Sequence, residues 1–104
     1  MGSYRVDVTN TARREIRKLP GHMRSLIFRE IQSLEREARP YYSKEMRSTR
    51  NFIIPKGVEL RRIRLNRWRV VYILEEDTAL ITVLAIRKHP PYQYEDLESL
   101  LSEG

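Results

Sequence analysis

Residues 60–72 read Leu-Arg-Arg-Ile-Arg-Leu-Asn-Arg-Trp-Arg-Val-Val-Tyr, and this stretch decides the predicted fold. Residues 60–65 are predicted to form a strand, along which successive side chains point to opposite faces. Asn66-Arg67 predicts a two-residue turn, in which Asn tolerates a positive φ. The run 68–74 is rich in β-branched and aromatic residues. A second strand is therefore predicted to return antiparallel to the first.

Further strands are predicted on both sides of this hairpin. After a polar turn at 75–78, the nearly continuous apolar run 80–86 is typical of a strand in the centre of a sheet. Near the start of the chain, residues 4–8 alternate between apolar and polar side chains. That alternation predicts a half-buried first strand.

Two helices are predicted between the first strand and the hairpin. Side chains at 9–11 can cap a helix that reaches about Leu19, and Pro20-Gly21 ends it. A second helix is predicted over 22–37, because apolar side chains recur there at helical spacing. Its apolar stripe consists of Met23, Ile27, Ile31 and Leu34, flanked by Leu26 and Phe28.

The remaining segments carry weaker patterns. Residues 39–57 read as a long basic connection, in which the apolar island 52–54 either extends a strand or anchors the loop. Residues 94–101 predict a short terminal helix. The order β-α-α-β-β-β-(α) indicates an α+β fold, with an antiparallel sheet packed on an N-terminal helical hairpin. At this length a single domain over 1–104 is expected.

A basic composition narrows the classes of partner. Sixteen arginines and four lysines against 14 acidic residues give a net charge of +6, which favours a polyanion, an anionic membrane or an acidic protein. The chain has no cysteine and its two histidines lack metal-ligand spacing, so no metal or other cofactor is expected. No apolar run approaches the roughly 20 residues of a membrane span. No signal peptide is visible, so the cytoplasm is the expected location.

The first candidate site is the arginine-rich face of the hairpin. Arg62 and Arg64 share one face of their strand, whereas Arg61 shares the other face with Ile63. The cross-strand register is open at this point, but Arg69 can lie near Arg62 and Arg64 across the turn. Like charges this close repel each other, and a bound anion relieves the repulsion. The alternative is a solvated strand face with scattered arginines.

The second candidate cluster is the basic and aromatic segment 87–94. It contains Arg87, Lys88, His89, Tyr92 and Tyr94. Histidine exchanges protons near neutral pH, and tyrosine can stack on a base or act as an acid. Such residues suit RNA cleavage, in which a 2′-OH attacks the adjacent phosphate and cations stabilise the phosphorane. The alternatives are a basic strand end and tyrosines that pack the terminal helix.

The sequence resembles the RelE/ParE superfamily of toxins from bacterial type II toxin–antitoxin systems. The resemblance covers nearly the whole chain and is carried by segments 12–20, 22–37 and above all 60–72. It implies a partner antitoxin. RelE-like members are ribonucleases that cut mRNA in the ribosomal A site, whereas ParE-like members poison DNA gyrase and lack the nuclease residues.

The resemblance also implies roles for individual residues. Arg69 corresponds to a phosphate and transition-state ligand, and Arg62 and Arg64 to basic residues on the preceding strand. His89 lies where members carry arginine or histidine, and Tyr94 near the tyrosine that stacks on the mRNA base. These five are the candidate catalytic residues. The candidate RNA-binding residues are Arg61, Arg67, Arg87, Lys88, Tyr92, Lys44 and Arg47.

The general base is left open by this comparison. RelE itself has lysines where this chain has arginines, and arginine is a poor base because its pKa exceeds about 12. His89, Lys88, Glu45 or another residue would take that role. A ribosome-dependent mRNA endonuclease is the favoured function. The alternatives are a ParE-like gyrase inhibitor and a catalytically inactive RNA- or ribosome-binding domain.

Overall fold

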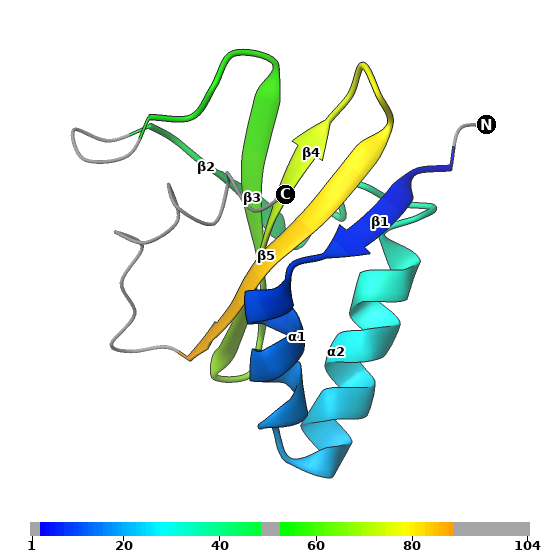
Figure 1. Ribbon diagram of the computed structural model, residues 1–104, viewed down its shortest axis with the longest axis vertical. Coiled ribbons are helices and arrows are strands. Elements are labelled where there is room, and N and C mark those ends of the chain that lie inside the picture. The colour runs from blue at the N-terminus through cyan, green and yellow to red at the C-terminus, as the bar shows by residue number, and fades with distance from the viewer. Residues whose placement is uncertain (1–2, 49–52, 89–104) are drawn as a thin grey trace.

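The computed structural model describes residues 3–48 and 53–88. Seven elements follow one another along the chain (Figure 1). They are β1 (Arg5–Val8), α1 (Asn10–Arg17), α2 (Gly21–Ser33), β2 (Ser43–Met46), β3 (Val58–Leu65), β4 (Trp68–Glu75) and β5 (Leu80–Lys88). The predicted α+β class and the order of its first strand, helical pair and three-strand meander are confirmed. The terminal helix predicted over 94–101 lies outside the described residues.

The strands form one sheet in the order β1-β5-β4-β3-β2. Strands β2 to β5 pair antiparallel in succession, whereas β1 pairs parallel with β5, from Arg5 opposite Leu80 to Val8 opposite Val83. The expectation of an entirely antiparallel sheet is therefore wrong at β1. Three chain reversals separate β2 from β5 and leave β5 running in the direction of β1. β5 lies between two strands, as its apolar run predicts.

Strand β2 was not predicted, because 39–57 was interpreted as a connection. Its sequence, Ser-Lys-Glu-Met, contains no β-branched or aromatic residue, so propensity gives little signal. It forms an edge strand through backbone pairing with β3, where Lys44 lies opposite Arg62. Of the apolar island 52–54, Ile53 and Ile54 are described and neither is in a strand. Ile54 instead packs against buried residues of the sheet, as an anchor for the loop.

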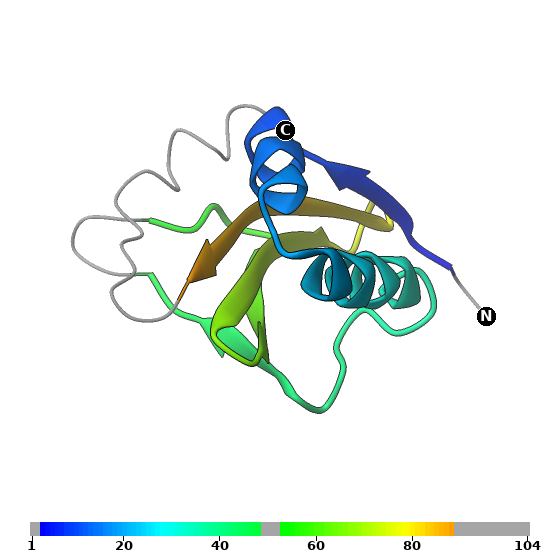
Figure 2. The same cartoon turned by 90° about the horizontal axis from the view of Figure 1, so that it is seen from below.

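The core lies on both faces of the sheet. On the helix side, Met23, Ile27 and Ile31 of α2 and Leu34 directly after it are buried, as predicted for this apolar stripe. They pack with Ile63, Val70, Tyr72 and Ile86 of the sheet. Figure 2 shows the twisted sheet curving past α2. The opposite face carries a smaller cluster of Leu60, Val71, Ile73, Leu84 and Ala85. This second cluster supports the strand face that carries the candidate arginines.

Thr9 joins helix α1 to the sheet. Its hydroxyl accepts a hydrogen bond from the Ala12 N–H (3.1 Å) and donates one to the Leu84 carbonyl (2.9 Å). The residue is buried, so both partners depend on this hydroxyl. Among the three predicted capping residues, Thr9 is the one that caps the helix.

We predict that Thr9→Ala destabilises the fold by about 1–2 kcal/mol, because it removes the cap and leaves a buried carbonyl without this donor. Urea unfolding measures the change. Ser25→Ala, at an exposed position of α2, is the matched control and should stay within about 0.5 kcal/mol of the parent. Equal stability of the two variants would contradict the role given to Thr9.

Candidate functional site

Strand register brings the basic residues of four strands to one face. Arg64 lies directly opposite Arg69, Arg69 opposite Arg87, and Lys44 opposite Arg62. Residues opposed in an antiparallel pair project to the same side. The register thus decides what the sequence left open, since Arg62, Arg64 and Arg69 share a face, and it is the face away from the main core.

These side chains surround a hollow of about 200 Å³, lined by Tyr42, Lys44, Arg62, Arg64 and Arg69. We call it the cationic hollow. Arg69 forms its floor and is only 5% exposed. Since a water molecule occupies about 30 Å³ in the liquid, the hollow has room for a group of phosphate size. Four cations around one small space favour an anionic occupant.

Tyr42 is a member of this hollow that the sequence did not predict. Its hydroxyl donates a hydrogen bond to Glu30 Oε2 of α2 at 2.6 Å. This bond, together with partial burial, raises the pKa of Tyr42 to about 12. The phenol therefore stays protonated at neutral pH, and its ring serves as a fixed wall of the hollow. The sequence signal that could have indicated this position is the pair Tyr41-Tyr42 within the basic segment 39–57.

Arg61 lies on the helix side of the sheet, as strand alternation predicted, and outside the cationic hollow. Its guanidinium donates to Ser43 Oγ (3.1 and 2.9 Å) and to Glu59 Oε1 (2.8 Å). The side chain is 12% exposed. Glu45 lies opposite Arg61 and so on the same side. The structure thus separates both Arg61 and the candidate base Glu45 from Arg69.

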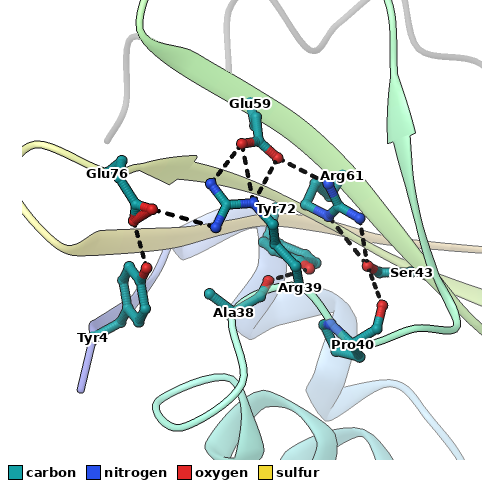
Figure 3. A network of polar contacts seen from close by, with 9 residues as sticks. All are labelled: Tyr4, Ala38, Arg39, Pro40, Ser43, Glu59, Arg61, Tyr72 and Glu76. Atoms are coloured by element: carbon teal, nitrogen blue, oxygen red, sulfur yellow. Dashed lines mark hydrogen bonds and ion pairs between the residues drawn. The ribbon is translucent and has the colours of Figure 1, made fainter. Parts of the chain in front are cut away.

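Arg61 belongs to a polar network that joins the α2–β2 connection to the sheet (Figure 3). Arg39 lies between two carboxylates, with Nη2 2.6 Å from Glu59 Oε2 and Nη1 3.3 Å from Glu76 Oε2. Tyr4 donates to Glu76, and the buried Tyr72 hydroxyl donates to the Ala38 carbonyl at 2.8 Å. Hydrogen bonding from Arg39, and then from Arg61, lowers the pKa of Glu59.

The other candidate residues are distributed as follows. Arg67 is exposed in the β3–β4 turn, beside Asn66, whose φ of 57° confirms the predicted turn chemistry. Arg87 forms an ion pair with Glu15 of α1 (Nε to Oε2, 3.4 Å).

Lys88 ends β5 opposite Trp68, on the helix side of the sheet. Arg47 is exposed after β2. His89, Tyr92 and Tyr94 lie outside the described residues.

Two further searches cover residues 3–48 and 53–88. Within these ranges, no group of three His, Cys, Asp or Glu side chains is arranged to hold a metal ion. No helix there has the length and apolar character needed to cross a membrane.

Comparison with known proteins decides the family. Residues 6–90 match the family described as "ParE toxin of type II toxin-antitoxin system, parDE". The chain belongs to the RelE/ParE toxin superfamily. It is thus a toxin of the type II toxin–antitoxin class. No curated protein sequence matches it significantly.

Solved structures confirm the fold of this RelE/ParE toxin. It is similar to the toxin of the archaeal RelE–RelB complex from Pyrococcus horikoshii OT3, with 20% identity and a TM-score of 0.73 over 86% of this chain and 99% of that one. It is also similar to the toxin–antitoxin complex RelBE2 from Mycobacterium tuberculosis, with 23% identity and a TM-score of 0.66 over 84% of this chain and 99% of that one. A third similar structure is the isolated E. coli RelE toxin, with 18% identity and a TM-score of 0.58 over 95% of this chain and 99% of that one. Each toxin named in these structures is a RelE, whereas the family match is to ParE.

We predict that millimolar inorganic phosphate or pyrophosphate raises the unfolding temperature of this toxin, because an anion that binds only the folded state stabilises it. The double variant Arg62→Ala/Arg64→Ala should lose most of this increase. Arg29→Ala/Arg36→Ala removes the same charge from exposed positions at α2 and beyond its end, and should keep it. Equal increases in both double variants would exclude the cationic hollow as the anion site.

The Arg39–Glu59 contact predicts a dependence of stability on pH. Because the pKa of Glu59 is lowered in the folded state, its contribution is present at neutral pH and is lost as the pH falls below about 4.5. Glu59→Gln should therefore cost about 1–2 kcal/mol at pH 7 and much less at pH 3. Urea unfolding at both values measures this. Glu35→Gln, at an exposed position, is the control and should change little at either pH.

Proposed function

We propose that this toxin is a metal-independent endoribonuclease that cuts mRNA in the ribosomal A site and thereby inhibits translation. The cationic hollow is the observation that carries the proposal. In it, Arg62, Arg64 and the buried Arg69 converge on a space of phosphate size. Planar guanidinium groups donate paired hydrogen bonds to phosphate oxygens, so this arrangement suits a phosphodiester.

The chemistry requires charge stabilisation and two proton transfers. A ribose 2′-oxygen forms a bond to the adjacent phosphorus and the bond to the 5′-oxygen breaks, leaving a 2′,3′-cyclic phosphate and a 5′-hydroxyl. Negative charge develops on the phosphorane oxygens, where fixed cations are most effective in a site shielded from water. Arg69, at 5% exposure, meets that condition best among the three arginines.

The proton transfers need groups other than these arginines. Arginine stays protonated at neutral pH and can only donate hydrogen bonds. We assign the base to His89, because Lys88 lies on the helix side of the sheet, away from the cationic hollow. The stacking and acid roles are assigned to Tyr94. Tyr92 is the second choice for the stacking role. This assignment follows the family pattern. Arg87, which lies opposite Arg69, precedes His89 by two positions in the sequence.

A second function, inhibition of DNA gyrase, is favoured by one specific observation. The family match over 6–90 is to ParE toxins. In that case the same basic face would contact a protein rather than the scissile phosphate, and cleavage of RNA would be absent. A catalytically inactive ribosome-binding domain is the remaining alternative.

We also propose a cognate antitoxin that neutralises the toxin in the cytoplasm. The similar archaeal and mycobacterial structures are toxin–antitoxin complexes, which supports a partner of this kind. An acidic or amphipathic antitoxin segment would complement the basic surface around Arg62 and Arg64.

The decisive experiment is cleavage mapping of a translating mRNA with purified toxin. Cuts confined to A-site codons are the expected result. Arg69→Ala should lower the single-turnover cleavage rate about 10²–10³-fold, as is typical for loss of one transition-state donor. His89→Ala should also lower it and relieve growth arrest in cells that lack the antitoxin.

Arg29→Ala, at an exposed α2 position, is the control and should cleave as the parent does. Because Arg69 is buried, Arg62→Ala provides a second test that disturbs the fold less. No cuts, together with an accumulation of gyrase-linked DNA breaks, would replace the nuclease proposal with gyrase inhibition. Full toxicity of both Arg69→Ala and His89→Ala would refute the assigned residues.

A further inference from the structure

Tyr41 is the most exposed large hydrophobic side chain among residues 3–48 and 53–88. It is 97% exposed, although aromatic rings usually bury most of their surface. Its ring stands edge-on to that of Tyr42, with the centroids 5.2 Å apart and the planes at 87°. Tyr42 lines the cationic hollow, so the Tyr41 ring packs against one wall of the hollow. A ring this exposed adds almost nothing to the stability of the fold.

The backbone around Tyr41 is held from both sides. The Ser43 N–H and hydroxyl both donate to the Pro40 carbonyl (2.8 and 2.7 Å), which closes a turn across Tyr41 and Tyr42. Arg61 in turn donates to Ser43 Oγ, and Tyr42 is bound to Glu30 of α2. Tyr41 is therefore presented to solvent from an ordered turn, and little ordering is needed before it binds a ligand.

We propose that Tyr41 is a stacking platform for an unpaired nucleobase of the strand whose phosphate lies in the cationic hollow. The inference rests on the proposed function and adds a base-binding subsite to it. The cations can hold a phosphate but give no contact that every base shares. Every base has a π face, however, and that face can stack on an aromatic ring whatever the sequence. Tyr41 supplies such a ring next to Tyr42, which lines the hollow, and the residue is 97% exposed.

Tyr41 is distinct from the tyrosines at 92 and 94 in position and in source. It lies in the α2–β2 connection, and its exposure, rather than the family pattern, points to a role in binding. Its role is binding, since it donates no group to the reaction.

The test measures binding of a short, fluorescently labelled, single-stranded RNA by anisotropy, without ribosomes. Tyr41→Ala should weaken binding by about 5-fold or more, as expected for the loss of one stacked base. Tyr41→Phe should bind as the parent does, because it keeps the ring. Tyr41→Leu, which keeps apolar bulk without a π face, should bind as weakly as Tyr41→Ala. Unfolding temperatures should be equal throughout, since the side chain is exposed.

Two further measurements distinguish the contribution of base stacking to RNA binding from that of charge. Tyr41→Ala should leave the slope of log K against log salt unchanged, whereas Lys44→Ala should reduce it by about 0.7, the value for one phosphate contact on a single strand. An oligonucleotide whose bases are replaced by abasic sites should bind the parent and Tyr41→Ala equally.

Equal RNA binding by the parent and Tyr41→Ala, or recovery of binding in Tyr41→Leu, would overturn the proposal. So would a Tyr41→Ala variant that binds RNA normally but no longer inhibits gyrase, because Tyr41 would then contact a protein. The outcome is separable from that of the proposed function. If ribosomal cleavage fails while Tyr41→Ala still weakens RNA binding, the nuclease proposal falls and the base subsite stands.

Discussion

The eight-residue register between β3 and β4 is the constraint on which the site depends. Ile63 opposite Val70 is buried against the helices, so the next pair, Arg64 opposite Arg69, must face the other way. A slip of one residue would reverse every side chain of the strand and place arginines in the core. The cost of burying those charges keeps the register in place, and the register keeps the arginines together.

The sheet accommodates a nearly buried arginine because its second face is only partly apolar. Leu60 and Val71 belong to the smaller cluster on that face, and the basic residues extend the same face towards the β3–β4 turn. The helix side of the sheet is the main apolar core, and on that side the Arg61 guanidinium is bound by the Glu59 carboxylate and the Ser43 hydroxyl. Alternation along a single strand thus separates an arginine that holds the fold together from arginines that line the cationic hollow.

Sequence patterns predicted the helices from apolar side chains at helical spacing and the hairpin from its β-prone residues and its turn. They predicted the faces of the hairpin's arginines from the alternation of side chains along a strand. They did not predict β2, whose Ser-Lys-Glu-Met sequence becomes a strand only through backbone pairing with β3. The parallel direction of β1 was missed because periodicity carries no information on partner or direction. Tyr42 was missed for a related reason, since a side chain in a connection has no period and its position depends on Glu30 of another element.

The parallel pairing of β1 with β5 affects the time at which the sheet can be completed. The two strands are joined by no hairpin, and Arg5 and its partner Leu80 are separated by the whole of the helical pair and the meander. At synthesis rates of about 5–20 residues per second, β1 leaves the ribosome several seconds before its partner exists. Closing so long a loop is slow compared with forming the local hairpins. The edge of the sheet that joins the first strand to the last is therefore expected to assemble after the face that carries the arginines.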